Sequence, residues 1–291
     1  MVNSHPDWRT YAPSYADFVH ITGNSTSGPV PVGNDTCLLP ANGKWPYHAV
    51  IPLNTDLDQN NGRKWHNAAG ISMHTKRLEP HDLEKVATAT LAYYEERAED
   101  FRAGTRDHDV SQNIGALLRH IKGEPPFVIL DFGCGPGRDL KTLAALGHTA
   151  IGLEGAAAFA AMARADTGCE VWQQDFYRLD LPRERFDGIF ANASLFHVPS
   201  QELPRVLRQL RDALKPGGVL FSSNPHGRNE EGWNRGRYGA YHDLETWRRY
   251  MFDAGFIELE HYYRPTGLPR EQQPWLASAW RRPSPYNTGA D

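Results

Sequence analysis

Long apolar runs are missing from this 291-residue sequence, and its opening stretch, residues 1–7, is polar. A helix that crosses a bilayer needs about 20 mostly apolar residues, and a secretory signal needs an apolar segment close to its start. The sequence offers neither. We therefore expect no membrane partner and a cytoplasmic location.

Cysteine is scarce as well. The three cysteines, Cys37, Cys134 and Cys169, are odd in number and far apart in the sequence. This spacing matches neither a disulfide framework nor a zinc site. The 13 histidines are scattered, and no His-Glu-x-x-His pair occurs among them. We expect reduced cysteines and no bound metal.

An excess of basic residues is also absent, because 31 Lys and Arg stand against 35 Asp and Glu, a net charge of −4. Proteins that bind nucleic acids usually carry clustered positive charge. The sequence therefore favours a small-molecule partner over a nucleic acid. It leaves a monomer and a homodimer open.

Residues 1–78 lack the periodicity of helices and strands. They are rich in Pro, Gly, Asn, Ser and Thr, yet they also carry aromatics such as Trp8, Trp45 and Trp65. Disordered tails are poor in aromatics, whereas long irregular segments often have a functional role. We predict an irregular N-terminal extension over residues 1–78 that serves as a lid over a substrate site, followed by a folded domain over residues 79–285.

Short apolar strands alternate with helices from residue 127 onward. Such alternation predicts a parallel sheet with helices on both faces. Before it, the spacing of apolar residues predicts two helices, and after it a helix and a terminal strand pair. The expected helices are 79–100, 110–121, 138–146, 155–166, 201–214 and 242–254, and the expected strands are 127–130, 149–153, 170–173, 186–191, 219–223, 256–263 and 275–280.

A glycine-rich turn joins the first of these strands to the next helix. Asp131 ends the strand, and Gly133, Gly135 and Gly137 follow at every second position. A side chain in this turn would block a nucleotide-type cofactor that lies across the ends of the strands. The loop therefore predicts a cofactor site.

Two further acids end the neighbouring strands. Glu154 ends the second strand and could accept hydrogen bonds from both ribose hydroxyls of a cofactor. After the third strand, Asp175 could accept from an adenine amino group while Phe176 covers the base. Each acid alone is compatible with a cap or a turn, but their occurrence after three successive strands favours the cofactor. A nicotinamide-dependent oxidoreductase is the alternative, although its Gly-x-Gly-x-x-Gly fingerprint requires a glycine where Arg138 stands.

The segment from about residue 93 to residue 280 resembles the class I S-adenosylmethionine-dependent methyltransferases. The resemblance rests on the loop at 131–137, the acids Glu154 and Asp175, the strand at 186–190 and the Lys-Pro-Gly-Gly turn at 215–218. Gly-Arg-Asp at 137–139 and Ala-Ser-Leu-x-His-Val at 193–198 are similar to bacterial small-molecule methyltransferases.

The resemblance implies a Rossmann-like α/β fold with a seven-stranded, mostly parallel sheet, helices on both faces and a C-terminal antiparallel hairpin. It also implies S-adenosylmethionine as the cofactor and methyl transfer to an N, S or O atom of a small polar metabolite, for example an amine, an imidazole or a thiol. Arg106 becomes a candidate partner for the cofactor's carboxylate. The candidate cofactor-binding residues are Tyr93 (or Tyr94), Arg106, Asp131, Gly133, Gly135, Gly137, Arg138, Glu154, Asp175, Phe176 and Asn192.

The acceptor is expected over the ends of the fourth and fifth strands. There His197 and His226 are candidate catalytic bases, since a neutral imidazole titrates near neutral pH. In similar proteins a His at the place of His197 often has a packing or hydrogen-bonding role beside the cofactor instead. The candidate substrate-binding residues are Asn224, Trp233, Arg237 and Tyr238. A nucleic-acid or protein acceptor and a cofactor-binding regulator are alternatives. The Asn-Pro-Pro-aromatic sequence of many base methyltransferases is missing after the fourth strand.

Overall fold

The structure is a computed structural model that describes residues 77–284. The extension and lid predicted for residues 1–78 lie outside these residues, apart from the last two, and stay a prediction. Within residues 77–284, no helix is both long and apolar enough to cross a membrane.

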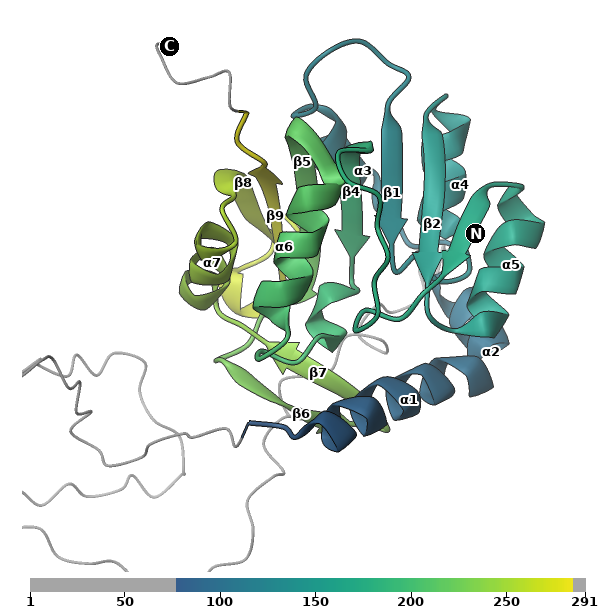
Figure 1. The fold of residues 1–291 in the computed structure, drawn as a ribbon, viewed down its shortest axis with the longest axis vertical. Coiled ribbons are helices and arrows are strands. Elements are labelled where there is room, and N and C mark those ends of the chain that lie inside the picture. The colour runs from purple at the N-terminus through teal and green to yellow at the C-terminus, as the bar shows by residue number, and fades with distance from the viewer. Residues whose placement is uncertain (1–76, 285–291) are drawn as a thin grey trace, which may run out of the picture. The chain divides into compact units, whose positions relative to one another are not determined.

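One seven-stranded sheet forms the centre of the described domain, in the order β3-β2-β1-β4-β5-β9-β8 (Figure 1). The first five strands are parallel, and β9 runs antiparallel to both β5 and β8. This confirms the predicted fold class and the C-terminal antiparallel hairpin. The strands are β1 (Val128–Phe132), β2 (Thr149–Glu154), β3 (Glu170–Gln173), β4 (Phe186–Asn192), β5 (Leu214–Pro225), β8 (Ile257–Arg264) and β9 (Trp275–Arg281).

The helices follow the predicted order with one division. The first expected helix is split at Arg97, whose backbone leaves the helical conformation (φ −116°, ψ 20°). The helices are α1 (Pro80–Glu96), α2 (Ala98–Thr105), α3 (Ser111–Leu118), α4 (Arg138–Ala145), α5 (Ala157–Thr167), α6 (Leu203–Ala213) and α7 (Leu244–Asp253), with short 3-10 turns η3 (Leu195–His197) and η4 (Arg270–Gln272).

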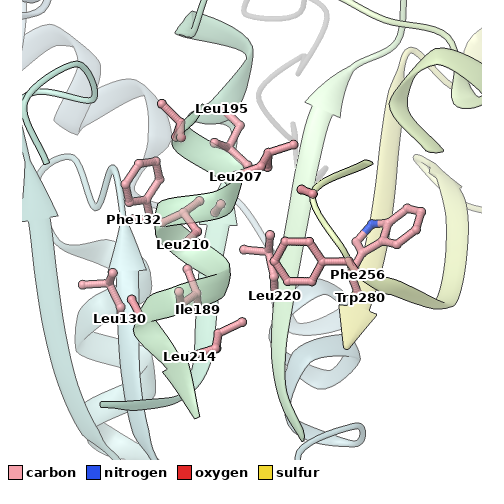
Figure 2. Packing of buried hydrophobic residues seen from close by; sticks show 14 of the residues in the cluster. Leu130, Phe132, Ile189, Leu195, Leu207, Leu210, Leu214, Leu220, Phe256 and Trp280 are labelled. Carbon is pink, nitrogen blue, oxygen red and sulfur yellow. The ribbon is translucent and has the colours of Figure 1, made fainter. Parts of the chain in front are cut away.

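The alternation of side chains along each strand divides the core between the two faces of the sheet. Leu130 and Phe132 of β1 belong to one buried cluster with Leu207 and Leu210 of α6 (Figure 2), and the cluster extends to α7. Ile129, on the opposite face of the same strand, packs with α3, α4 and α5. Burial on both faces explains why the central strands are almost wholly apolar.

A second, two-stranded sheet covers the carboxyl edge of the first. The sequence predicted no strand between 219–223 and the helix at 242–254, but β5 extends to Pro225 and a hairpin follows, made of β6 (Glu230–Asn234) and β7 (Arg237–Tyr241). Gly236, at φ +89°, provides the left-handed turn that closes it. Figure 1 shows this hairpin and α1 together across the ends of the parallel strands, and α1 contacts β7 directly.

Candidate active site

The glycine-rich turn after β1 lies against the loop that follows β4. Gly133 has φ +76°, and a Cβ atom at this position would lie 2.5 Å from Cβ of Ser194 and 3.2 Å from the ring of Phe176. Gly135 (φ +54°) and Gly137 (φ +95°) also adopt left-handed backbone conformations. Only glycine tolerates both the conformation and the close approach, so the turn leaves bare backbone at the carboxyl edge.

Two buried carboxylates flank this turn. Glu154 is 8% exposed and accepts hydrogen bonds from the backbone N–H groups of Gly135 (2.8 Å) and Ala156 (2.9 Å). Asp131 is 2% exposed, and its Oδ2 has no hydrogen-bond partner among the described residues. Burial raises the pKa of both groups, and the nearby charge of Asp139 raises that of Asp131 further. An unpaired buried carboxylate oxygen is costly unless a ligand donates to it.

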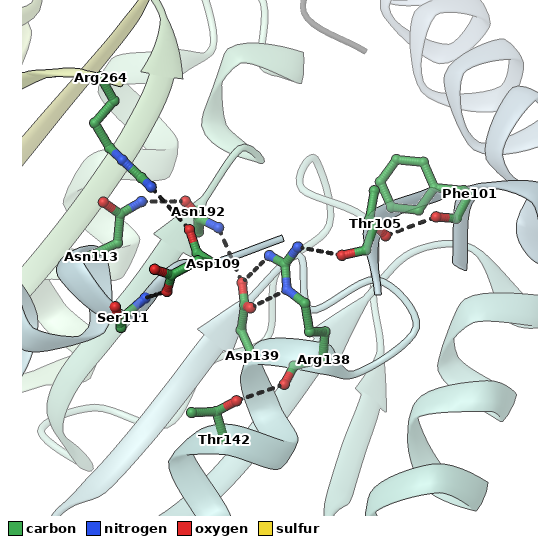
Figure 3. A network of polar contacts seen from close by, with 10 residues as sticks. All are labelled: Phe101, Thr105, Asp109, Ser111, Asn113, Arg138, Asp139, Thr142, Asn192 and Arg264. Atoms are coloured by element: carbon green, nitrogen blue, oxygen red, sulfur yellow. Dashed lines mark hydrogen bonds and ion pairs between the residues drawn. The ribbon is translucent and has the colours of Figure 1, made fainter. Parts of the chain in front are cut away.

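A hydrogen-bond network holds the start of α4 in place (Figure 3). Arg138 makes a two-pronged ion pair with Asp139, at 2.6 and 2.9 Å, and donates to the Thr105 carbonyl at 2.9 Å. Asn192, at the end of β4, donates to Asp139 at 3.1 Å and accepts from Asn113 of α3 at 2.9 Å. The network thus links the cofactor turn to α2, β4 and α3.

The other candidate cofactor residues differ in their surroundings. Arg106 is exposed and pairs with Asp107 at 3.4 Å. Asp175 accepts from the backbone N–H of Tyr177 at 2.7 Å, while the Phe176 ring stacks on Phe132 with centroids 4.3 Å apart. Phe176 therefore contacts the glycine turn, whereas the side chain of Arg106 points to solvent.

On the acceptor side, one tyrosine hydroxyl joins three elements. Tyr94 Oη, from α1, lies 2.8 Å from Nε2 of His197 in η3 and 3.0 Å from Nη1 of Arg237 in β7. The other His197 nitrogen, Nδ1, lies 2.6 Å from the carbonyl oxygen of Tyr238. Because a carbonyl only accepts, Nδ1 carries the proton and Nε2 accepts from Tyr94. Arg237 in turn donates to Tyr94.

The ionisation of this cluster is set by burial. Burial lowers the pKa of His197 to about 3, and the positive charge of Arg237 acts in the same direction. Burial raises the pKa of Tyr94 to about 12, although Arg237 opposes that change. At pH 7 both groups are neutral.

The candidate residues after β5 are divided between two places. Asn224 lines a small cavity of about 10 Å³ together with Phe196 and His242. His226 lies elsewhere, with its ring edge-on to Tyr263 at 5.4 Å and its backbone N–H donating to Pro274. The structure thus separates His226 from the cavity that Asn224 lines.

The remaining two candidates lie on the hairpin. Trp233 is 48% exposed and stacks edge-on against Tyr238 at 5.7 Å. Tyr238 is buried, and its backbone N–H donates to Thr90 of α1 at 3.0 Å.

Within residues 77–284, no group of three or more His, Cys, Asp or Glu side chains could hold a metal ion.

Sequence reasoning missed His242. It is 9% exposed, its Nδ1 has no hydrogen-bond partner among the described residues, and burial lowers its pKa to about 4. Asn224 Oδ1, beside the same cavity, also has no partner there. His242 follows a strand that was not predicted, so no signal in the sequence pointed it toward this cavity.

Comparison with known proteins identifies the class of this site. Residues 129–218 match the family model of the methyltransferase domain. The chain is 23% identical over 204 residues to an uncharacterized methyltransferase of Anoxybacillus flavithermus, which covers 65% of this chain and 96% of that protein. It is 32% identical over 118 residues to a trans-aconitate 2-methyltransferase of Azoarcus, over 39% of this chain and 45% of that one.

Solved structures share the fold. The 1,6-didemethyltoxoflavin-N1-methyltransferase of Burkholderia thailandensis, solved with S-adenosylhomocysteine, superposes with a TM-score of 0.59 at 20% identity, over 71% of this chain and 92% of that one. The methyltransferase-domain match, the methyltransferase relatives and this fold together support a class I S-adenosylmethionine-dependent methyltransferase. The prediction of the family, the enzyme class and the cofactor is confirmed.

The residues at the turn fit this cofactor. A side chain at Gly133 would fill the space over the turn, and Asp131 leaves a buried carboxylate oxygen without a donor. The ammonium and hydroxyl groups of the cofactor are donors that could pair with such an oxygen. Each oxygen of Glu154 accepts one backbone N–H and retains a lone pair for a ribose hydroxyl.

Proposed function

We propose that this enzyme transfers the methyl group to a small polar metabolite that enters between α1, η3 and the β6–β7 hairpin. The observation that carries this proposal is the Tyr94 hydroxyl, which contacts His197 and Arg237 beside the end of β4. Three elements from distant parts of the chain meet there, next to the cofactor turn. The acceptors named for the two similar proteins, trans-aconitate and 1,6-didemethyltoxoflavin, are small polar molecules and support the same class.

For the cofactor, we propose that Glu154 binds the ribose hydroxyls and that Asp131 lies at the methionine end. Asp175 and Phe176 bind the adenine. The hydrogen-bond network of Arg138 and Asn192 stabilises the conformation of the glycine-rich turn. Tyr93 stays a candidate for the methionine end. Arg106 stays a candidate for the methionine carboxylate only if its ion pair with Asp107 breaks.

When bound, S-adenosylmethionine supplies an electrophilic methyl group on a sulfonium. This chain holds the acceptor in line with that methyl group and excludes water. His197 and His226 remain the candidate bases from the sequence. We propose that His197 positions Tyr94, because both of its nitrogens are engaged and a pKa of about 3 leaves it unable to retain a proton at pH 7.

Residues 1–78 are proposed to extend the acceptor site. The backbone N–H of Leu78, inside the described domain, donates to the Gln201 side chain at 2.7 Å, and the backbone carbonyl of Leu78 accepts from that side chain at 3.1 Å. The chain therefore enters the domain beside the segment that follows β4. Deleting residues 1–75 is expected to raise KM for the acceptor, and full turnover without them would refute this proposal.

The proposal on the acceptor class is tested by following tritium from methyl-labelled S-adenosylmethionine into a cell extract. Label is expected in the small-molecule fraction with the wild type and not with Glu154→Ala. Label found only in the RNA or protein fraction would overturn the small-molecule acceptor. A parallel titration with S-adenosylhomocysteine and NADH checks the cofactor, since tight binding of NADH alone would contradict methyl transfer.

A further inference from the structure

Arg237 carries a charge that no described residue neutralises. Its Nη1 donates to the Tyr94 hydroxyl, and its Cζ lies 5.4 and 5.7 Å from the ring centroids of Tyr93 and Tyr94. Its Nε is buried and has no hydrogen-bond partner, and no carboxylate of the described domain lies within ion-pair distance. Other guanidinium groups that border the sheet bind acids or carbonyls: Asp139 for Arg138, Glu258 for Arg248, and two backbone carbonyls for Arg281.

Desolvation makes this arrangement costly unless a ligand compensates for it. A guanidinium has five N–H donors in a fixed fork, and here one of them meets a neutral hydroxyl. The two tyrosine rings stabilise a cation only weakly. Arg237 is half-buried, and its Nε is shielded from solvent. A partly desolvated charge without a counter-ion is unfavourable, so the geometry favours an anionic group from outside the chain.

The neighbouring groups do not supply that negative charge. Tyr94 and His197 are neutral at pH 7, as derived above. Glu231, on the adjacent strand β6, accepts from the backbone N–H of Ser200 at 2.7 Å. The sulfonium of the cofactor would add a second positive charge near the same place. Like charges repel a cationic amine there, whereas an anion is attracted by both.

We propose that the methyl acceptor carries an oxyanion, either a carboxylate or a phosphate-type group, and that Arg237 binds it through its unpaired N–H groups beside Tyr93 and Tyr94. This inference rests on the proposed function and narrows it to anionic acceptors. Arg is suited to the role because its planar fork matches the paired oxygens of such groups.

Methylation of such an oxyanion requires no base. The C–S bond breaks with its electron pair remaining on sulfur, and a C–O bond forms to the ionised oxygen. The sulfonium becomes a neutral thioether, the acceptor loses one negative charge, and no proton is released. A neutral His197 is compatible with this reaction.

The proposal is tested with enzyme saturated with S-adenosylhomocysteine, by calorimetry at constant ionic strength. The probes are malonate and glutarate as carboxylates, inorganic phosphate and phenylphosphonate as phosphate-type anions, and ethanolamine as a cation. The variants are Arg237→Gln, Arg237→Lys and, as a control that removes one exposed charge on α6, Arg208→Gln. Thermal melts check that each variant is folded.

At least one anion is expected to bind the wild type, and the carboxylate and phosphate arms identify which class. Arg237→Gln should weaken it by about tenfold or more, because a charge-assisted pair is lost. Arg237→Lys should weaken anion binding less, because the positive charge remains although the planar guanidinium is lost. Arg208→Gln should have no effect on anion binding.

Equal anion affinity in Arg237→Gln, no anion binding to the wild type, or preference for ethanolamine would each overturn the inference. S-adenosylhomocysteine affinity should stay within about twofold in every variant, since none touches the cofactor turn. Failure of the wild type to bind S-adenosylhomocysteine would instead contradict the proposed function itself. If Arg237→Gln does not fold, Arg237→Lys with the same probes decides.

Discussion

The two halves of the carboxyl edge are built in different ways. On the cofactor side, the turn at 131–139 and Glu154 come from two consecutive strands, and the buried ionisable groups are acids. On the acceptor side, Tyr94, His197 and Arg237 come from three segments far apart in the chain, and the ionisable groups that meet there are a tyrosine, a histidine and an arginine. The cofactor half is thus defined locally, and the acceptor half only by the tertiary fold.

The stability contributions of the two halves depend on pH in opposite directions, because one half contains acids and the other contains histidines. Burial raises the pKa of Asp131 and Glu154, so the folded protein binds protons there more readily, and their contribution to stability is lost as the pH rises through the folded pKa. Burial lowers the pKa of His197 and His242, so their contribution is complete above pH 6.5 and is lost as the pH falls.

The largest expected effect belongs to Glu154→Ala, in the cofactor half. It removes the acceptor of two backbone N–H groups, those of Gly135 and Ala156. Each buried donor left unpaired costs about 1–3 kcal/mol, so the free energy of unfolding should fall by about 2–6 kcal/mol. Loss of the ribose contact should weaken S-adenosylhomocysteine by about 100-fold. Urea unfolding and calorimetry measure the two effects, and an unchanged cofactor affinity would contradict the assignment.

The acceptor half is expected to dominate acid denaturation. Between pH 6.5 and about 4, His197 and His242 are protonated in the unfolded chain but stay neutral in the folded protein. Stability should therefore fall with decreasing pH by about 1.4 kcal/mol per unit for each histidine. His242→Asn should remove the contribution of one histidine, about 1.4 kcal/mol per pH unit, from this slope. Urea unfolding at pH 7 and pH 5 measures the change. His81→Asn, at an exposed position on α1, is the control; equal slopes in the two variants would refute the account.

Tyr94→Phe should separate catalysis from cofactor binding. The change removes one hydroxyl and leaves His197 Nε2 without its donor. We expect kcat to fall by about 10- to 30-fold and stability by about 1–2 kcal/mol, while S-adenosylhomocysteine affinity stays within about twofold. Steady-state kinetics and calorimetry test this. A loss of cofactor affinity as large as the loss of kcat would place Tyr94 in the cofactor half instead.

The smallest effect is expected at the far end of the network that supports the cofactor turn. The Tyr262 hydroxyl, on β8, donates to Oδ1 of the buried Asn113 at 2.9 Å, and Asn113 donates to Asn192. Tyr262→Phe should lower stability by about 1 kcal/mol and S-adenosylhomocysteine affinity by about two- to threefold. A change in acceptor KM with no change in cofactor affinity would show that the network serves the other half.

The same comparison explains what the sequence could predict. Strand and helix order, the glycine turn and the strand-end acids are local patterns, and they led to the fold, the enzyme class and the cofactor. The β6–β7 hairpin was missed because residues 224–238 are dense in polar and aromatic side chains, which favoured a loop at the acceptor site. Its strands pair locally, for example Trp233 opposite Tyr238, but β7 also contacts α1, and no local window of sequence contains that contact.

The acceptor residues show the same limit. His197 and Arg237 were named from the sequence, but the tyrosine hydroxyl that joins them lies 103 and 143 positions away. His242 was missed although it lines the cavity with Asn224, and His226, which was named, contacts Tyr263 instead. Which histidine faces a cavity depends on the course of the backbone after β5, and residue type alone does not determine it.

A crystal structure with S-adenosylhomocysteine tests the account most directly. Ribose hydroxyls are expected within about 3 Å of the Glu154 carboxylate, and the thioether sulfur is expected to face the Tyr94–His197 contact and the guanidinium of Arg237. A ribose bound away from Glu154, or a sulfur directed away from Tyr94 and Arg237, would contradict it.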